Sequence, residues 1–171
     1  MSTTERIVQR IAAALRAQGA MLATAESCTG GLVAAACTDV AGSSEWFERG
    51  FVTYSNAAKV ELLGVPATLI EAHGAVSAEV ARAMAEGAIA ASAARHAVAV
   101  TGIAGPGGGS AEKPVGTVWL ACSERGGPTD TRLLEARGDR AAIRAQSVSA
   151  ALGLLLESLE AASTGSAANP T

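Results

Sequence analysis

The sequence predicts a single α/β domain with a mainly parallel β-sheet that is covered by helices on both faces. Short apolar runs of strand length alternate along the chain with longer segments that carry an apolar residue every three or four positions. A chain of 171 residues with 49% apolar residues is long enough for one well-buried core and short for two. Such alternation is typical of a parallel sheet, whose site lies at the carboxyl ends of the strands.

Composition and charge argue against several classes of protein. The formal net charge of −3 lacks the basic excess of a nucleic-acid binder. Three cysteines without a Cys-x-x-Cys spacing predict neither a disulfide framework nor a structural zinc site, which fits a reducing cytoplasm. No apolar run approaches the about 18 residues that a membrane span needs. We therefore expect a cytoplasmic protein with no nucleic-acid or membrane partner.

Helix and strand patterns alternate in the first part of the chain. Gly19 is expected to end an amphipathic first helix. Ser55 and Ser77 are of the type that caps a helix, and Gly64 and Gly74 are of the type that ends one. The expected elements are a helix over 3–19, a strand over 20–23, a helix over 32–39, a strand over 50–54 and helices over 57–63, 66–73 and 77–95.

The last part of the chain predicts three more strands and a long final helix. The turn over 125–127 is short enough for the strands that flank it to pair antiparallel. Residues 161–171 are small and polar and predict a disordered tail, so the single domain is expected to cover 1–160. The expected elements are strands over 97–101, 115–121 and 131–134 and a helix from Asp139 with a buried stripe of Ile143, Val148, Leu152, Leu155 and Leu159.

Residues 24–31, Thr-Ala-Glu-Ser-Cys-Thr-Gly-Gly, are the strongest candidate for a site. An apolar run precedes them and an alanine-rich segment follows, which is typical of a strand, a tight turn and a helix N-terminus. The first turn of a helix offers backbone N–H groups to an anion, and the glycines allow a close approach. Ser27 and Cys28 are both candidate nucleophiles. An alternative is that Thr29 only caps the helix and the glycines only permit packing on the sheet.

Polar residues follow three of the predicted strands. In a parallel sheet the carboxyl ends of the strands meet at one edge, so we expect these residues to share one cleft. The glycine-rich loop over 102–114 is neither a dinucleotide fingerprint nor a P-loop. The polar residues are Glu26, Ser27 and Thr29 after the first strand, Tyr54, Ser55, Asn56 and Lys59 after the second, and Thr101, Ser110, Glu112 and Lys113 after the third.

Lysine is rare in this chain. Of the 13 basic residues only Lys59 and Lys113 are lysines, and both lie within or beside the candidate loops. A desolvated lysine, unlike arginine, can become a neutral amine and act as a base, although chance placement on the surface is an alternative. Lowering a lysine pKa from ~10.4 by about three units requires about 4 kcal/mol. His73 and His96 are expected to cap helix ends, so neither a Ser-His-Asp triad nor a histidine-ligated metal is predicted.

Four of the five aromatic residues flank Lys59 in the sequence. Tyr54 adjoins polar residues at the end of a strand and is the better candidate for a role in the site. Trp46 and Phe47 fit a core position or a subunit contact at least as well.

Four ordered motifs resemble the CinA C-terminal domain family. They are Thr-Ala-Glu-Ser-Cys-Thr-Gly-Gly at 24–31, Gly-Ser-Ser at 42–44, Thr-Tyr-Ser-Asn-Ala-Ala-Lys at 53–59, and Thr-Gly-Ile-Ala-Gly-Pro with Lys-Pro-Val-Gly-Thr-Val at 101–106 and 113–118. The resemblance implies a three-layer α/β/α sandwich with a five-stranded, mostly parallel mixed sheet, and a homodimer or higher homo-oligomer. Longer members carry an additional N-terminal domain that is similar to molybdopterin-binding proteins, and we expect this chain to lack it.

For the enzyme-like members, the resemblance implies hydrolysis of the carboxamide of nicotinamide mononucleotide to nicotinate mononucleotide and ammonia, without a metal or other cofactor. Carried onto matching positions, Ser27 is then the nucleophile and Lys59 its base, with Tyr54 and Ser44 in the same polar network. Cys28 is the rival nucleophile, although a lysine-activated hydroxyl fits these surroundings better. The oxyanion of the tetrahedral intermediate would face backbone N–H groups at 28–30.

The phosphate of such a nucleotide needs a cation or a cluster of N–H groups. The loop over 105–110, Lys113, Arg140 and Arg144 are candidates, although Arg140 and Arg144 could instead pair with acids along the last helix. The residues expected to contact the substrate are Glu26, Cys28, Thr29, Gly30, Gly31, Asn56, Thr101, Gly102, Gly105, Arg140 and Arg144.

A non-catalytic module that binds a nucleotide or a protein partner is the alternative, as the competence- and damage-associated naming of the family suggests. The same glycine-rich loops would serve it. Such a module has no need for Ser27, Lys59 and Tyr54 together, so their joint presence favours an enzyme.

Overall fold

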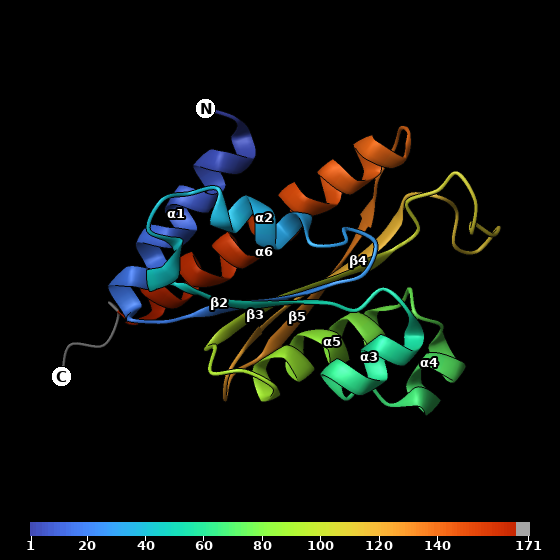
Figure 1. The fold of residues 1–171 in the computed structure, drawn as a ribbon, viewed down its shortest axis with the longest axis horizontal. Coiled ribbons are helices and arrows are strands. Elements are labelled where there is room, and N and C mark those ends of the chain that lie inside the picture. The colour runs from blue at the N-terminus through green and yellow to red at the C-terminus, as the bar shows by residue number, and fades with distance from the viewer. Residues whose placement is uncertain (167–171) are drawn as a thin grey trace.

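A five-stranded sheet lies between two layers of helices in a computed structural model that describes residues 1–166 (Figure 1). The predicted three-layer α/β/α sandwich is thereby confirmed. The strands are β1 (Leu22–Glu26), β2 (Phe47–Val52), β3 (His96–Gly102), β4 (Thr117–Glu124) and β5 (Thr129–Glu135). The helices are α1 (Thr3–Gln18), α2 (Leu32–Thr38), the short 3-10 helix η1 (Ser43–Glu45), α3 (Asn56–Leu63), α4 (Ala67–His73), α5 (Ala78–Ala90) and α6 (Arg140–Ser166).

The sheet is mixed and mostly parallel, as expected, with the strand order β2-β1-β3-β4-β5. β1 pairs parallel with β2 and β3, whereas β4 pairs antiparallel with β3 and β5. Four of the five strands therefore share one direction, and only β4 opposes them. Since β1, β2 and β3 end at the same edge of the sheet, the loops that follow them leave the sheet side by side.

The two faces of the sheet carry side chains of different size. In β3, Val98 and Val100 pack into the core on one face, and Ala97 and Ala99 pack into the core on the other. Figure 1 shows α1, α2 and α6 over the first face and α3, α4 and α5 over the second. The small residues of the second face allow α5 to pack close to the strands.

Local signals place the ends of several helices where the sequence predicts them. Ser2 caps α1, and it forms a reciprocal capping box with Glu5. Ser55 caps α3, and Gly64 ends it in the left-handed conformation with φ of 64°. The local sequence therefore determines the two ends of α3, whereas tertiary packing decides its buried face, since Lys59 is buried and Leu62 is exposed.

α5 is shorter than predicted, because it ends at Ala90 rather than near Arg95. The guanidinium group of Arg125 donates to the carbonyl oxygens of Ser92 and Ala94. These long-range hydrogen bonds stabilise a non-helical connection into β3, and a periodicity argument does not detect them.

The two histidines lie in different settings. His73 occupies the last turn of α4, as predicted. His96 is a buried residue that begins β3, and its Nε2 lies 3.1 Å from Oε1 of Gln18. The prediction that His96 caps a helix is therefore wrong. Burial lowers the pKa of His96.

α6 extends past residue 160, where the sequence predicts the end of the domain. Its predicted apolar stripe, from Ile143 to Leu159, is buried against the sheet. Residues 161–166 continue the helix instead of forming a disordered tail, and 167–171 lie outside the described residues. Among residues 1–166, neither α6 nor a shorter helix has the length and hydropathy of a membrane-spanning segment.

Candidate active site

The loops after β1, β2 and β3 meet around a cavity of about 210 Å³. β1 continues to Glu26, so the turn of the first loop begins at Ser27. The convergence that parallel strands predict is confirmed. The residues that line the cavity are Ser27, Cys28, Tyr54, Asn56, Lys59, Ala75, Val76, Thr101, Gly102, Ala104 and Arg140.

The amine of Lys59 is buried beside the hydroxyl of Ser27. Its Nζ lies 3.0 Å from Ser27 Oγ, 3.0 Å from the carbonyl oxygen of Thr53 and 3.1 Å from that of Tyr54. Only 1% of Lys59 is exposed, and it forms no ion pair with any other residue in 1–166. Burial without a compensating carboxylate lowers the pKa of Lys59.

These three contacts accommodate both protonation states of the amine. A protonated amine donates its three N–H groups to three oxygen atoms. After loss of a proton, the carbonyls of Thr53 and Tyr54 still accept two N–H groups, and the lone pair faces the hydroxyl of Ser27. The neutral amine is thus placed to accept the serine proton, as nucleophilic catalysis by a hydroxyl requires.

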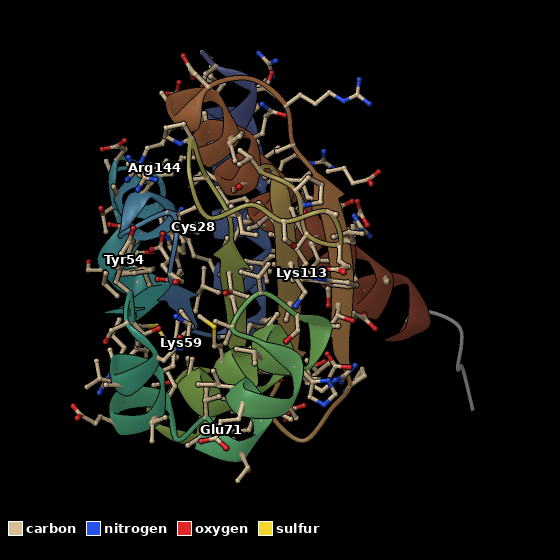
Figure 2. The ribbon with its side chains drawn as sticks, turned by 90° about the vertical axis from the view of Figure 1, so that its right-hand side faces the viewer. Cys28, Tyr54, Lys59, Glu71, Lys113 and Arg144 are labelled. Atoms are coloured by element: carbon tan, nitrogen blue, oxygen red, sulfur yellow. The ribbon has the colours of Figure 1, made fainter. Side chains whose placement is uncertain are left out.

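α3 carries Lys59 to this position. The Ser55 hydroxyl accepts from the N–H of Ala58 at 3.0 Å and starts the helix directly after β2. Lys59 and Leu63, one helical turn apart, are the buried residues of α3. Figure 2 shows Lys59, Tyr54 and Cys28 grouped on the same side of the molecule.

Cys28 lines the cavity and is a poor nucleophile at neutral pH. Burial raises the pKa of the Cys28 thiol to about 11, and this outweighs the nearby charge of Arg144. The thiol is therefore protonated near pH 7. Among the two candidate nucleophiles, only Ser27 is hydrogen-bonded to Lys59.

Glu26 supports the turn and does not line the cavity. Its buried carboxylate accepts from the Thr29 hydroxyl at 2.7 Å and from the backbone N–H groups of Gly31 at 3.2 Å, Val33 at 2.8 Å and Ala34 at 3.0 Å. These are the free donors at the N-terminus of α2, so the chain's own carboxylate occupies the anion site that the sequence suggests for the substrate. Glu26 is therefore not placed to make the expected contact with a substrate in the cavity.

The cap of α2 also differs from the alternative considered for Thr29. Gly31, with φ of 103°, occupies the N-cap position and has no side chain of its own to cap the helix. The Thr29 side chain instead donates to Glu26. Both glycines of the motif adopt positive φ values, since Gly30 has φ of 58°.

Two backbone donors of the turn are not used by the main chain. The N–H of Ser27 donates to the carbonyl oxygen of Val100, and that of Gly30 donates to the carbonyl oxygen of Ser27. Across residues 1–166, the N–H groups of Cys28 and Thr29 have no main-chain acceptor. Because they directly follow the nucleophile candidate, these two groups are the candidate donors to an oxyanion.

Arg140 lies at the exposed side of the cavity. Its Nη1 donates to the carbonyl oxygen of Gly105 at 2.9 Å, and its Nη2 donates to the phenolic oxygen of Tyr54 at 3.4 Å. The Tyr54 side chain is 62% exposed, so its ring lies at the cavity mouth while its carbonyl contacts Lys59 inside. Arg140 is therefore the cation that an anionic group would meet at the mouth of the cavity.

Arg144 contacts the turn and is not among the cavity-lining residues. Its Nε donates to the carbonyl oxygen of Cys28 and its Nη2 to that of Thr29, both at 3.1 Å. Neither Arg140 nor Arg144 forms an ion pair with an acid of α6 in the described part of the chain. The alternative that they pair with acids along the last helix is therefore wrong.

Three other predicted residues line the cavity, and Ser44 lies away from it. Asn56, Thr101 and Gly102 line the cavity, and the Thr101 hydroxyl donates to the carbonyl oxygen of Ala75 at 2.8 Å. Ser44 does not join the network, because it is an exposed residue of η1, which precedes β2, whereas the cavity lies beyond the carboxyl end of β2.

The candidate phosphate ligand Lys113 contacts the protein itself. Its Nζ donates to the carbonyl oxygen of His73 at 2.8 Å and so ties the glycine-rich loop to the end of α4.

Trp46 is fully buried and packs edge-on against Phe47, with ring centroids 6.4 Å apart. Within 1–166, no three His, Cys, Asp or Glu side chains gather in a way that could hold a metal ion.

Sequence reasoning missed two kinds of contribution to the site. Ala75, Val76 and Ala104 form part of the cavity wall, but small apolar residues carry no chemical signal. The carbonyl oxygens of Thr53 and Tyr54, which hold the Lys59 amine, belong to the main chain and leave no trace in residue type.

Comparisons with known proteins agree with this architecture. The chain is 58% identical over 136 residues to nicotinamide-nucleotide amidohydrolase PncC of Enterobacter agglomerans, which covers 80% of this chain and 83% of the relative. It is 53% identical over 150 residues to the protein of the same name from Escherichia coli K12, covering 88% of this chain and 91% of the relative.

A solved structure and a family match extend the comparison. The crystal structure of competence/damage inducible protein CihA from Agrobacterium tumefaciens superposes with a TM-score of 0.90 at 48% identity, covering 94% of this chain and 97% of that one. The family model of the CinA C-terminal domain matches residues 4–159. The chain therefore belongs to the CinA C-terminal domain family.

Proposed function

We propose that this protein is an amidohydrolase that deamidates nicotinamide mononucleotide to nicotinate mononucleotide and ammonia through a Ser27–Lys59 pair. The observation that carries the proposal is the 3.0 Å contact between a buried lysine amine and a serine hydroxyl in a cavity. The names of two relatives at 58% and 53% identity support the substrate.

The first half of the reaction forms an acyl-enzyme. The neutral amine of Lys59 takes the proton of Ser27 as Oγ bonds to the carboxamide carbon. The carbonyl π-electron pair moves to oxygen, and the N–H groups of Cys28 and Thr29 stabilise the resulting oxyanion. When the tetrahedral intermediate collapses, the C–N bond breaks and the Lys59 ammonium gives its proton to the departing nitrogen, so that ammonia leaves.

The second half restores the enzyme. A water molecule enters the place of ammonia, and Lys59 removes one of its protons as the water oxygen bonds to the acyl carbon. Collapse of this second intermediate breaks the bond to Ser27 Oγ, which recovers a proton from Lys59. Nicotinate mononucleotide is released, and Ser27 and Lys59 return to their starting states.

The size of the cavity suggests how the nucleotide is bound. A volume of about 210 Å³ is smaller than the ~300–1,000 Å³ typical of sites that enclose a whole drug-sized ligand. We assign the pyridine carboxamide to the cavity and the ribose phosphate to its mouth, beside the exposed Arg140 and the Tyr54 ring. Asn56, Thr101 and Gly102 would contact the ring portion.

Release of ammonia from nicotinamide mononucleotide by the purified protein tests the proposal. We expect release by the natural sequence and none by Ser27→Ala. Binding of the nucleotide without ammonia release by the natural sequence would favour the alternative, a non-catalytic nucleotide- or partner-binding module. That module would not require a lysine with a lowered pKa beside a serine, and for this reason we rank it second.

We also propose that the protein is cytoplasmic and that it forms a homodimer or a higher homo-oligomer. Three buried, unpaired thiols are compatible with a reducing compartment. The oligomeric state rests on the family resemblance, and light scattering on the purified protein measures it. A monomer at all concentrations would contradict this part without affecting the proposed chemistry.

A further inference from the structure

The guanidinium group of Arg144 holds the turn after Ser27 from the side of α6. Nε donates to the carbonyl oxygen of Cys28 and Nη2 to that of Thr29, both at 3.1 Å. Figure 2 shows Arg144 beside Cys28, on the side away from Lys59. A planar guanidinium presents its donors in a rigid fork, so it can fix two neighbouring carbonyl groups at once.

Fixing these carbonyls also fixes two backbone donors. In a trans peptide the C=O and the following N–H point in opposite directions. The peptides that link Cys28 to Thr29 and Thr29 to Gly30 are trans, because the cis bond in residues 1–166 is Gly105–Pro106. With its carbonyl directed at Arg144, the first peptide must direct the N–H of Thr29 away from the Arg144 guanidinium group. The second peptide likewise directs the N–H of Gly30 away, to the carbonyl oxygen of Ser27.

The turn needs such an anchor because its sequence permits other conformations. Gly30 and Gly31 adopt φ values of 58° and 103°, and glycine populates positive and negative φ with similar ease. Glu26 holds the α2 end of the turn through Gly31 and Val33. On the side of the nucleophile, the side-chain contacts to the carbonyls of the turn come from Arg144.

We propose that Arg144 is a positioning residue that sets the orientation of the peptide between Cys28 and Thr29 and so aims the Thr29 N–H at the oxyanion of the reaction. This inference rests on the proposed function for the identity of the oxyanion. It replaces the expectation that Arg144 binds the substrate phosphate. Two of its three guanidinium nitrogen atoms donate to the turn, and Arg140, not Arg144, lines the cavity.

Steady-state kinetics of Arg144 variants test the role of Arg144. Arg144→Met keeps the length of the side chain and removes its donors. We expect its kcat to fall by about 10²–10³-fold, the loss typical of a missing oxyanion donor, with little change in KM. Because the neutral amine of Lys59 is the active form, kcat should rise with pH. The midpoint of this rise should be the same in Arg144→Met, because the contact between Ser27 and Lys59 is not altered. Arg144→Lys should be impaired too, since one ammonium cannot reproduce the fork.

Two controls separate positioning from general destabilisation. Arg132→Met removes an exposed arginine that pairs with Glu157 of α6 at 2.6 Å, away from the turn, and should keep normal kcat and KM. Adding guanidinium ion to Arg144→Ala should restore part of the lost kcat, which a merely structural defect would not show. If Arg144→Met does not fold, as judged by circular dichroism, the kcat of Arg144→Lys decides the question.

Two results would overturn the proposal. The first is a normal kcat in Arg144→Met, and a raised KM beside it would make Arg144 a substrate ligand. The second is an unchanged peptide between Cys28 and Thr29 in a crystal structure of Arg144→Met, whereas a reoriented peptide would support the positioning role. If the natural sequence does not deamidate nicotinamide mononucleotide, the proposed function fails, and the crystal structure alone decides about Arg144.

Discussion

The amine of Lys59 and the hydroxyl of Ser27 are 3.0 Å apart in space and 32 positions apart in the sequence. Ser27 follows β1, and Lys59 belongs to the helix that follows β2, the parallel neighbour of β1. A serine hydroxyl alone is a weak nucleophile, and a solvated lysine is protonated at neutral pH. The chemistry of the site therefore depends on this tertiary contact.

Ser27→Ala should abolish amide hydrolysis and leave the fold intact, because the change removes a single oxygen atom from a turn. Ammonia release at saturating nicotinamide mononucleotide measures the loss, and thermal unfolding checks the fold. Cys28→Ala is the matched control and should retain most of its turnover, since the Cys28 pKa of about 11 keeps the thiol protonated. A dead Cys28→Ala protein beside an active Ser27→Ala protein would assign the nucleophile to the thiol.

Lys59→Arg should lower kcat by about 10²–10⁴-fold, with a much smaller effect on KM, because arginine keeps the charge and cannot act as the base. In the natural sequence kcat should rise with pH through the lowered pKa of Lys59, since the neutral amine is the active form. The variant should lose this rise. Near-normal kcat in Lys59→Arg would refute the assignment of the base and leave the activation of Ser27 without an explanation.

Folding stability should also depend on the protonation of Lys59. Burial lowers its pKa in the folded state below the ~10.4 expected in the unfolded chain. Between these two pKa values the unfolded state binds one more proton, so the contribution of Lys59 to the free energy of unfolding becomes more favourable as the pH rises. Below the folded-state pKa this gain is absent.

Urea denaturation of the natural sequence and of Lys59→Met at several pH values isolates this contribution. The buried thiols Cys28, Cys37 and Cys122 have raised pKa values and act in the opposite direction, but they are common to both proteins. The difference in stability between the two proteins should therefore favour Lys59→Met most at low pH and shrink as the pH rises. A difference that does not depend on pH would contradict the lowered pKa.

Glu26→Ala should destabilise the protein by at least about 2 kcal/mol. It leaves N–H groups at the start of α2 without partners, and each buried unpaired donor costs about 1–3 kcal/mol. The exposed Glu61 of α3 provides the matched control, and Glu61→Ala should change stability little. Denaturant titration compares the two, and equal stability of both variants would exclude the anchoring role of Glu26.

Activity should survive dialysis against a chelator. The proposed steps use a hydroxyl, an amine and backbone N–H groups, and residues 1–166 contain no cluster of at least three metal-ligating side chains. The measurement is ammonia release before and after treatment with a chelator. Loss of activity that a divalent cation restores would require a different scheme, with Glu26 and Asp39 as the first ligands to examine.

The sequence by itself determined the features that depend on near neighbours. The Ser55 cap and the Gly64 stop define the two ends of α3. The apolar stripe of α6 and the short turn between β4 and β5 were likewise predictable. Parallel strands also placed the loops of Ser27 and Lys59 at one edge, because that rule depends only on the direction of the strands.

Only the tertiary structure decided which group each polar side chain contacts. Glu26 and Ser27 are adjacent in the strand and turn, yet Glu26 binds the N-terminus of α2 and Ser27 lines the cavity. Arg140 and Arg144 lie one helical turn apart, yet Arg140 reaches the cavity mouth and Arg144 the carbonyls of the turn. Ser44 belongs to a family motif but lies before β2, away from the other motif residues. Hydrogen-bond partners distant in sequence are chosen by packing of the layers, which residue type and spacing along the chain do not encode.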